Sequence, residues 1–509
     1  MSNRRKRNLR RKCDTFFAKM EKAGLALTYK DVRLKTRHSD ILPKDADLHT
    51  RFSRNVSLNM PLVSAAMDTV TEAAMAIVMA ELGGLGIIHK NLTPDEQSSA
   101  VEKVKHKLNA FIPDPVCIHD SQTVKEILEF IDRKRYGFHS FPVLDASGNI
   151  IGIVTSRDFK FCTTETKKIS DIMSTKIISA TEGTDISAAY KALMKNRISI
   201  LPVFSRKGKL KGIYTLSDVK RIVSGLSPNH NLATDGTLKV GAAIGVGEDA
   251  KERMELLAKA RVDVVVIDTA HGDSGSVIEM VKYCKRHYPK IDVVAGNISE
   301  PESAKALARA GADGVKVGQG PGSICTTRII AGVGCPQVTA VYNCAKVLRG
   351  SGVPVNGDGG VEHSGDLSVC LGAGADSIMV GKLLAGTTES PGEIIIRPDQ
   401  KQKKVYRGMG SLEAMKDSKA SKERYGQGDA TADKLVPEGV KTEVNFQGDV
   451  SKIVYQLLGG LRSGMGYLGA RTIAELQKRA DFHRITSAGL QESHPHGLGR
   501  IEDAPNYRA

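Results

Sequence analysis

The segment GQGPGSICTTR, residues 318–328, holds the side chains best suited to chemistry in this chain of 509 residues. Its three glycines and one proline bring backbone N–H groups close together, which suits the binding of an anion or another ligand. Ser323 adds a hydroxyl, and Cys325 supplies a thiol that can attack an electrophilic carbon as its thiolate. Most isolated cysteines are small buried apolar residues. A glycine-rich loop directly after an apolar strand instead indicates a nucleophile at Cys325.

Eight apolar runs of strand length, separated by helical stretches, must position this loop. They occupy residues 61–65, 86–89, 240–246, 263–268, 292–297, 314–318, 353–360 and 376–381. Continuous apolar strands joined by helices are typical of parallel strands covered by helices. Eight of them predict an α/β fold of the (β/α)8 TIM-barrel type, with a doubly wound open sheet as the alternative. A barrel places chemistry at the carboxyl ends of its strands and phosphate after strands seven and eight, where Gly359-Gly360 and Gly381-Lys382 stand.

Two of the helical stretches carry start and stop signals. Thr69 and Glu72 form a capping-box pattern before a helix predicted over residues 71–82, and Gly83 follows it. Ser299 and Glu302 form the same pattern before the helical run 304–310, and Gly311 follows that run.

An internal repeat with an offset of sixty residues interrupts the series of strands. FPVLDASGNIIGIVTSRD begins at residue 141, and LPVFSRKGKLKGIYTLSD begins at residue 201. Each copy is typical of two strands joined by a turn and followed by a helix. We expect the two copies to pack into one module over residues 110–226, inserted between the second and third barrel units. Thr155 with Asp158, and Thr215 with Asp218, are candidates for helix capping.

The composition narrows the class of protein. Hydrophobic residues make up 41% and charged residues 26% of the chain, which is typical of a globular protein. The net charge is +16, but seven of the positive charges lie in the first twelve residues, so phosphorylated small molecules are favoured over nucleic acid as partners. Without an apolar window of about 18 residues or a secretory signal, we expect no membrane span and a cytoplasmic location. None of the eight cysteines forms a C-x-x-C pair, so we expect free thiols and no zinc site.

GPGSICTTR is similar to the active-site loop of the IMP dehydrogenase / GMP reductase family. Further motifs resemble the dehydrogenase branch: SAAMDTVTE (64–72), GGLGIIHKNL (83–92), DTAHG (268–272), DGG (358–360), YRGMGS (406–411), KLVPEG (434–439) and QESH (491–494). The repeat resembles the tandem CBS (Bateman) module of that branch. The resemblance runs from residue 27 to residue 508 and implies a barrel of residues 27–109 and 227–509, with a mobile flap at about 399–440. The basic tail 1–26 falls outside it.

The resemblance implies NAD-dependent oxidation of IMP to XMP, with GMP reductase as the alternative. Cys325 would form a covalent bond to the purine. Arg424 and Tyr425, carried by the flap, would then activate water together with Thr327, and Glu438 would offer a second proton path. The resemblance also implies a homotetramer or an octamer, a K⁺ ion, and control by ATP or GTP at the CBS module.

The remaining site residues follow from the same resemblance. Those expected to bind substrate are Ser323, Asp358, Gly359, Gly360, Gly381, Lys382, Tyr406, Gly408, Met409, Gly410 and Glu438. Those expected to bind the cofactor are Asp268, Gly318 and Gly320. The K⁺ ion would be held by Gly320, Gly322 and Cys325, with Glu492, Ser493 and His494 of a neighbouring subunit. The regulatory nucleotides would bind at Thr155, Asp158, Thr215 and Asp218. The chain departs from the family pattern at Lys382, where a serine is usual, and at Gln319, Asp273 and Asn356-Gly357.

Overall fold

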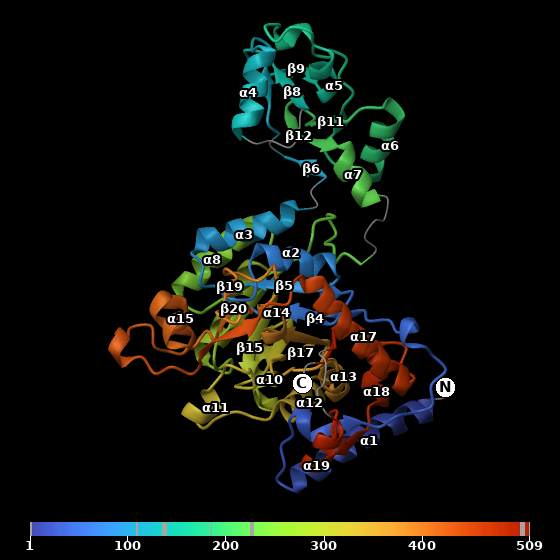
Figure 1. The fold of residues 1–509 in the computed structure, drawn as a ribbon, viewed down its shortest axis with the longest axis vertical. Coiled ribbons are helices and arrows are strands. Elements are labelled where there is room, and N and C mark those ends of the chain that lie inside the picture. The colour runs from blue at the N-terminus through green and yellow to red at the C-terminus, as the bar shows by residue number, and fades with distance from the viewer. Residues whose placement is uncertain are drawn as a thin grey trace. The chain divides into compact units, whose positions relative to one another are not determined.

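The computed structural model describes residues 3–107, 110–113, 115–134, 140–184, 186–223, 229–498 and 504–507. The chain forms two compact units (Figure 1). One unit comprises Met1–Lys107 and Asn229–Ala509, and the other comprises Leu108–Pro228.

The larger unit is a closed barrel of eight parallel strands, which confirms the predicted (β/α)8 fold and excludes the open sheet. Around the barrel the strands are β13 (Gly241–Ile244), β14 (Val264–Asp268), β15 (Asp292–Ile298), β16 (Gly314–Val317), β17 (Val355–Asp358), β18 (Ser377–Val380), β4 (Leu62–Ser64) and β5 (Leu85–Ile88). Each strand lies within, or one residue outside, an apolar run of the sequence. All five residues of β14 are buried, as expected of a strand covered on both faces.

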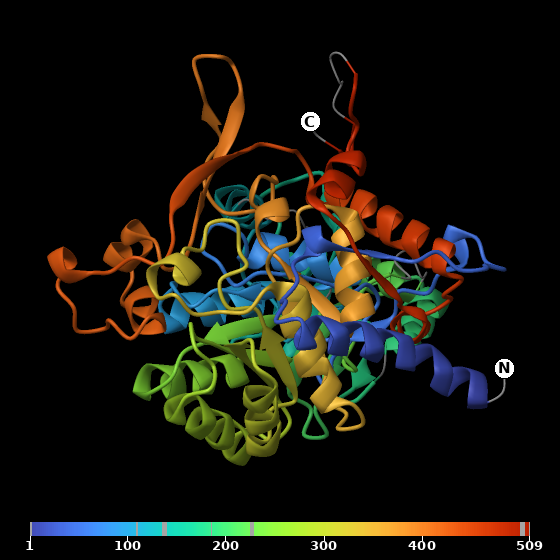
Figure 2. The ribbon, with the colours of Figure 1, turned by 90° about the horizontal axis from the view of Figure 1, so that it is seen from below.

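Helices surround the barrel (Figures 1 and 2). They are α2 (Ala73–Glu81), α3 (Pro94–His106), α8 (Glu248–Lys259), α9 (Gly275–His287), α10 (Pro301–Ala310), α11 (Thr327–Ile330), α12 (Gln337–Leu348), α13 (Ser364–Ala373), α14 (Lys382–Ala385), α17 (Val450–Leu468) and α18 (Ile473–Arg479). The short strands β2 (Thr50–Arg51) and β3 (Ser57–Leu58) form a hairpin, and its Phe52 and Leu58 pack with barrel residues in one apolar core.

Both predicted capping boxes are wrong. Helix α2 begins after Glu72, and the hydroxyl of Thr69 instead accepts the backbone N–H of Arg407 at 3.3 Å. Helix α10 begins after Glu300, and the hydroxyl of Ser299 donates to Oε1 of Gln319 at 2.7 Å. In place of a helix N-terminus, the hydroxyl of Thr69 contacts the last residue of β20, and that of Ser299 contacts the loop after β16.

A three-stranded antiparallel sheet adds to the barrel and carries the segment expected to act as a flap. It consists of β19 (Ile395–Ile396), β20 (Gln402–Arg407) and β21 (Lys441–Asn445). We call residues 408–440, between β20 and β21, the flap segment. The resemblance implies a mobile flap there, and the structure gives this segment α15 (Leu412–Asp417), α16 (Lys419–Arg424) and the 3-10 turn Ala432–Lys434.

The two ends of the chain pack against the barrel unit. Strand β1 (Val32–Leu34) pairs with β22 (Phe482–Arg484), and α19 (Ser487–Glu492) follows it. The basic tail, for which the sequence offered no structure, is the helix α1 (Asn3–Lys22), which runs along the outside of the barrel (Figure 2). Phe17 of α1 stacks on Tyr342 with ring centroids 3.8 Å apart. This stacking packs the C-terminal part of α1 against the barrel unit.

The smaller unit contains two similar halves, as the repeat predicts. One half has β7 (Ile118–His119), β8 (Phe141–Leu144), β9 (Ile150–Val154), α4 (Val124–Lys134) and α5 (Ser156–Lys160). The other has β6 (Phe111–Ile112), β10 (Ala180–Thr181), β11 (Ile200–Phe204), β12 (Leu210–Thr215), α6 (Ile186–Asn196) and α7 (Leu216–Val223). The registers correspond, since Pro142 pairs with Ile153 and Pro202 with Ile213. Each half has its own apolar core.

Candidate active site

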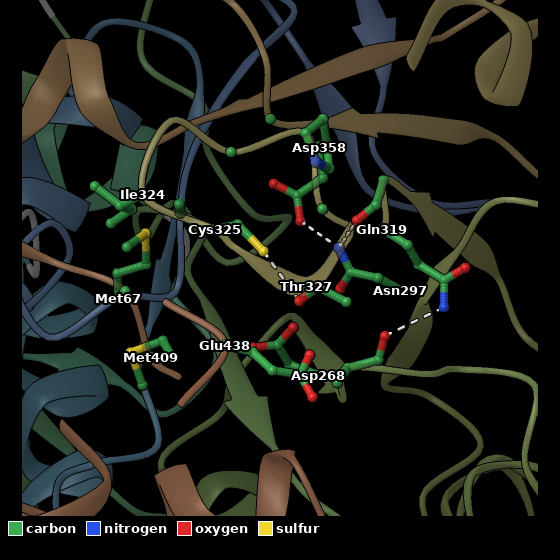
Figure 3. A pocket seen from close by; sticks show the side chains of 18 of the residues that line it. Met67, Asp268, Asn297, Gln319, Ile324, Cys325, Thr327, Asp358, Met409 and Glu438 are labelled. Atoms are coloured by element: carbon green, nitrogen blue, oxygen red, sulfur yellow. Dashed lines mark hydrogen bonds between the residues drawn. The ribbon is translucent and has the colours of Figure 1, made fainter. Parts of the chain in front are cut away.

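A cavity of about 130 Å³ lies at the carboxyl ends of the barrel strands and contains Cys325 (Figure 3). Its walls come from the loop after β16, from the ends of the neighbouring strands and from the flap segment. On one side stand Asp358 and Asn297, and on the other the apolar side chains of Met67, Ile324 and Met409 (Figure 3). The cavity therefore offers polar groups on one wall and an apolar surface on the other.

Cys325 points toward Thr327, and its Sγ lies 3.1 Å from the Thr327 hydroxyl oxygen. The Cys325 loop is joined to the flap segment by its backbone, because the N–H of Thr326 donates to the carbonyl of Glu438 at 2.9 Å. The loop also needs glycine at its start. A Cβ on Gly318, whose φ is +153°, would lie 2.0 Å from the carbonyl oxygen of Asp358. Any larger residue at position 318 would push the loop away from the end of β17.

Lys316, which the sequence analysis did not select, lies in the middle of the polar wall. Its side chain is 2% exposed, and its Nζ is 2.9 Å from the carboxylate of Asp268 and 2.7 Å from that of Asp358. Nζ also donates to the side-chain oxygen of Asn297, whose amide nitrogen donates to Asp358 at 2.8 Å. A buried ammonium thus joins the two carboxylates predicted to bind cofactor and substrate. A lysine within the apolar run GVKVG was a signal that could have revealed it.

Arg424 and Tyr425 of the flap segment both line the cavity. The Arg424 guanidinium forms an ion pair with the carboxylate of Asp268, and the Arg424 carbonyl accepts the N–H of Ala270 at 3.2 Å. Burial raises the pKa of the Tyr425 hydroxyl. The flap segment is therefore docked on the barrel, with its arginine on the carboxylate that the sequence assigns to the cofactor.

A second buried lysine, Lys90, lies beside Arg424 after the end of β5. Its Nζ donates to the carbonyl oxygen of Asp268 at 3.2 Å, and the residue is 3% exposed. Burial, followed by the charge of Arg424, lowers the pKa of Lys90 to about 7. The other charged groups that act on it are Glu423, Arg253 and Asp249.

A second cavity of about 110 Å³ adjoins the first and gathers most of the residues predicted to bind phosphate. Its lining includes Ser323, Gly360, Gly381, Lys382 and Tyr406. Asp358 and Gly359 line both cavities. Burial raises the pKa of the Tyr406 phenol, so this group is a neutral hydrogen-bond donor near neutral pH. The two cavities together suit a molecule with a phosphate at one end and a reactive ring near Cys325.

The structure brings nearly all the other predicted residues to the first cavity. Gly320, Gly322, Gly408 and Glu438 line it. Gly410 does not, but a Cβ there would lie 2.5 Å from Cζ of Tyr425, so this glycine makes room for the flap tyrosine.

Three residues predicted to complete a cation site lie elsewhere in this chain. Glu492, Ser493 and His494 do not line the cavity, and Nδ1 of His494 is 2.9 Å from the hydroxyl of Tyr507. In the part of the chain that the structure describes, no cluster of three or more His, Cys, Asp and Glu side chains could hold a metal ion. No helix among the described residues is long and apolar enough to cross a membrane.

The four residues predicted to bind regulatory nucleotides are engaged at helix starts. The hydroxyl of Thr155 donates to Asp158 at 2.8 Å before α5, and that of Thr215 donates to Asp218 at 2.6 Å before α7. These contacts match helix capping, and the same groups face each helix N-terminus in both halves of the repeat.

Comparison with known proteins places this architecture in a family. The family model described as "IMP dehydrogenase / GMP reductase domain" matches residues 26–496. Inosine-5'-monophosphate dehydrogenase of Chlorobaculum parvum is 46% identical over 489 residues, which cover 95% of this chain and 98% of that protein. The enzyme of that name from Aquifex aeolicus is 47% identical over 484 residues, 94% of this chain and 97% of that protein.

A solved structure is also similar. A cysteine-to-alanine variant of GMP reductase from Trypanosoma brucei, in complex with guanosine 5'-monophosphate, superimposes with a TM-score of 0.83 at 39% identity. The match covers 94% of this chain and 100% of that one. The barrel, the cysteine loop and the full-length relatives all agree with the match to the family model, so the chain belongs to the IMP dehydrogenase / GMP reductase family.

Proposed function

We propose that this protein is an NAD-dependent IMP dehydrogenase, which oxidises IMP to XMP through a covalent adduct on Cys325. The observation that carries the proposal is the meeting of Cys325, Thr327, Arg424 and Tyr425 in one cavity. A nucleophile alone would serve either branch of the family. A flap arginine and tyrosine brought beside the nucleophile supply what the hydrolysis of a covalent adduct needs.

The substrate would span both cavities. Its phosphate would bind at Ser323, Gly360, Gly381, Lys382 and Tyr406, where Lys382 contributes a full positive charge in place of a hydroxyl. Its ribose hydroxyls would donate to Asp358, and backbone at Gly408, Met409 and Gly410 with Glu438 would contact the base.

The chemistry would proceed in two steps. The thiolate of Cys325 adds to C2 of the hypoxanthine ring, and a hydride leaves C2, so the purine is oxidised while sulfur stays bound. Water then adds at C2, the C–S bond breaks, and Cys325 is released as a thiolate. Arg424 takes the proton of this water, with Thr327 and Tyr425 orienting it. Lys90 and Lys316, both buried, lie near the same residue, Asp268, that Arg424 contacts.

NAD would bind where the flap arginine now lies. Asp268 fits a ribose because it is a buried carboxylate at a strand end, but one of its oxygens is engaged by Arg424. When bound, NAD accepts the hydride. The guanidinium of Arg424 and the cofactor ribose would thus occupy Asp268 in turn, which separates the oxidation from the hydrolysis.

A K⁺ ion would be held by backbone carbonyls of Gly320, Gly322 and Cys325. Carbonyl oxygens suit such a cation, although the carbonyl of Gly322 also accepts the N–H of Cys325 at 3.0 Å. Because Glu492 and its two neighbours lie away from this loop, they would reach the ion only from a second copy of the chain, in a tetramer or an octamer.

GMP reductase is the second candidate, favoured by the 39% identical structure of that name. The two functions are separated by one pair of assays. IMP with NAD and K⁺ should yield NADH and XMP, and Cys325→Ala should abolish this. Turnover of GMP with NADPH, and none of IMP with NAD, would assign the protein to the reductase branch.

The smaller unit would provide control by ATP or GTP bound at the two helix starts that Thr155 and Thr215 cap. Replacing residues 110–226 by a short linker should leave basal turnover intact and remove any response to these nucleotides. A folded deletion protein without activity would contradict this role.

A further inference from the structure

Side chains of the flap segment are also attached to the barrel away from Arg424. Ser421 of α16 is fully buried and donates its hydroxyl hydrogen to Oδ1 of Asn91 at 3.0 Å. Asn91 follows the end of β5, and its Nδ2 donates to Oδ2 of Asp68 at 2.8 Å. The side-chain amide of Asn91 therefore connects a flap helix to a carboxylate of the barrel.

The same carboxylate holds the beginning of the flap segment. Arg407, the last residue of β20, donates to Oδ2 of Asp68 at 2.8 Å. A second nitrogen of Arg407 donates to Asp417 at the end of α15, at 2.6 Å. The side chain of Asp68 is 9% exposed, so its own contacts are largely shielded from water, whereas the Asp417 side chain is 62% exposed. Both flap helices are thus connected to Asp68, one through Arg407 and the other through Asn91.

The chemistry of these groups determines how Asn91 is oriented. A carboxylate only accepts hydrogen bonds, so the amide nitrogen of Asn91 must face Asp68. Its oxygen is then left to accept the hydroxyl of Ser421. An asparagine at this position satisfies both neighbours, whereas an aspartate would repel Asp68 and an alanine would contact neither.

Ser421 also determines where Arg424 points. The two residues are three positions apart on α16, so their side chains share one face of the helix. Holding Ser421 against Asn91 directs this face toward the barrel, where Arg424 meets Asp268. Asn91 itself does not line the cavity that contains Cys325, so it acts through the flap and does not touch the reacting atoms.

We propose that Asn91 is a positioning residue that holds the flap segment docked through Ser421 and Asp68, and so sets the fraction of time that Arg424 spends at Asp268. Its consequence for turnover rests on the proposed function, but its effect on the flap segment does not.

The first test follows the flap segment by amide hydrogen exchange in the full-length protein without ligands. Asn91→Ala and Ser421→Ala each remove a hydrogen bond of ordinary strength, so exchange in residues 412–425 should rise about fivefold. Asn91→Asp should raise it at least as much, because it places two carboxylates together. The double variant should match Asn91→Ala, since both changes remove the same bond.

Lys419→Ala is the matched control on the same helix. Lys419 is exposed, and within the described residues its ion pair is with Glu423 of α16 at 3.4 Å, so its loss should leave exchange in the rest of the flap segment unchanged. Exchange at the wild-type level in both Asn91→Ala and Ser421→Ala would overturn the proposal.

The second test separates the two halves of the reaction. In Asn91→Ala and Ser421→Ala the rapid formation of NADH in the first turnover should keep its rate. Steady-state turnover should fall about fivefold, and the Cys325 adduct should accumulate. A general structural defect would slow both phases together, and that result would count against the proposal. If wild-type protein makes no NADH from IMP, the proposed function fails, and hydrogen exchange still decides the role of Asn91.

Discussion

Replacing Lys316 by methionine should weaken substrate binding strongly, because this lysine is the cation that Asp358 has in the folded protein. Its Nζ is 2.7 Å from Asp358 and 2.9 Å from Asp268, and the side chain is 2% exposed. Asp268 keeps a second cation in Arg424, whereas the donor that remains for the Asp358 carboxylate, among the residues the structure describes, is the amide of Asn297. Lys316→Met therefore leaves a carboxylate that is 19% exposed without its counter-charge.

Two magnitudes follow, one for folding stability and one for IMP affinity. Removing one partner of a buried ion pair costs about 3–5 kcal/mol of folding stability, because the other charge stays buried and unpaired. A hydrogen bond to a charged group is worth about 1.5–3 kcal/mol, so losing the placement of Asp358 should weaken IMP binding about 10- to 100-fold. Calorimetric titration of IMP into the Cys325→Ala protein, with and without Lys316→Met, measures the second quantity directly.

Lys105→Met is the matched control. Lys105 is also 2% exposed, and it pairs with Asp263 at 2.6 Å, outside both cavities. Lys105→Met should lower the thermal unfolding midpoint to a degree similar to Lys316→Met and leave the affinity for IMP unchanged. Wild-type affinity in Lys316→Met, or an equal loss in Lys105→Met, would refute the reasoning that Lys316 places the substrate carboxylate.

Three further outcomes are expected. Arg424→Ala should still form NADH in the first turnover, but its steady-state turnover should be slower by about 100-fold or more. The covalent adduct should then be visible in the mass of the intact protein. Normal steady-state turnover would contradict the role of Arg424. Gly410→Ala puts a Cβ 2.5 Å from Tyr425, so steady-state turnover should fall more than hydride transfer, whereas Gly459→Ala, with open space around it, should change neither. Burial, followed by the charge of Arg424, lowers the pKa of Lys90 from 10.5 to about 7 in the docked state, so docking is opposed progressively as the pH falls from the ordinary value toward 7 and is not opposed further below it. Corrected hydrogen exchange in residues 412–425 should therefore rise as the pH falls toward 7 and level off below 7, and Lys90→Met should abolish that rise.

The sequence by itself was enough to predict the barrel and the reactive loop. Strands buried on both faces need uninterrupted apolar runs, so β14 and its neighbours are visible as VVVID and similar segments. The Cys325 loop is visible because glycine is needed where backbones approach closely, as at Gly318 against Asp358. These signals are local: each depends on residues adjacent in the chain.

Tertiary structure alone decided which polar groups meet. Lys316 contacts Asp358, 42 positions along the chain, Arg424 reaches Asp268 across 156, and Ser421 reaches Asn91 across 330. Closing eight parallel strands into a barrel brings their carboxyl ends together whatever their separation in sequence. The failed capping boxes have the same origin, because the hydroxyls of Thr69 and Ser299 found partners in β20 and in the loop after β16, which tertiary structure brings near. Residue types can be read from the chain, but the partners of buried polar groups are set by three-dimensional proximity.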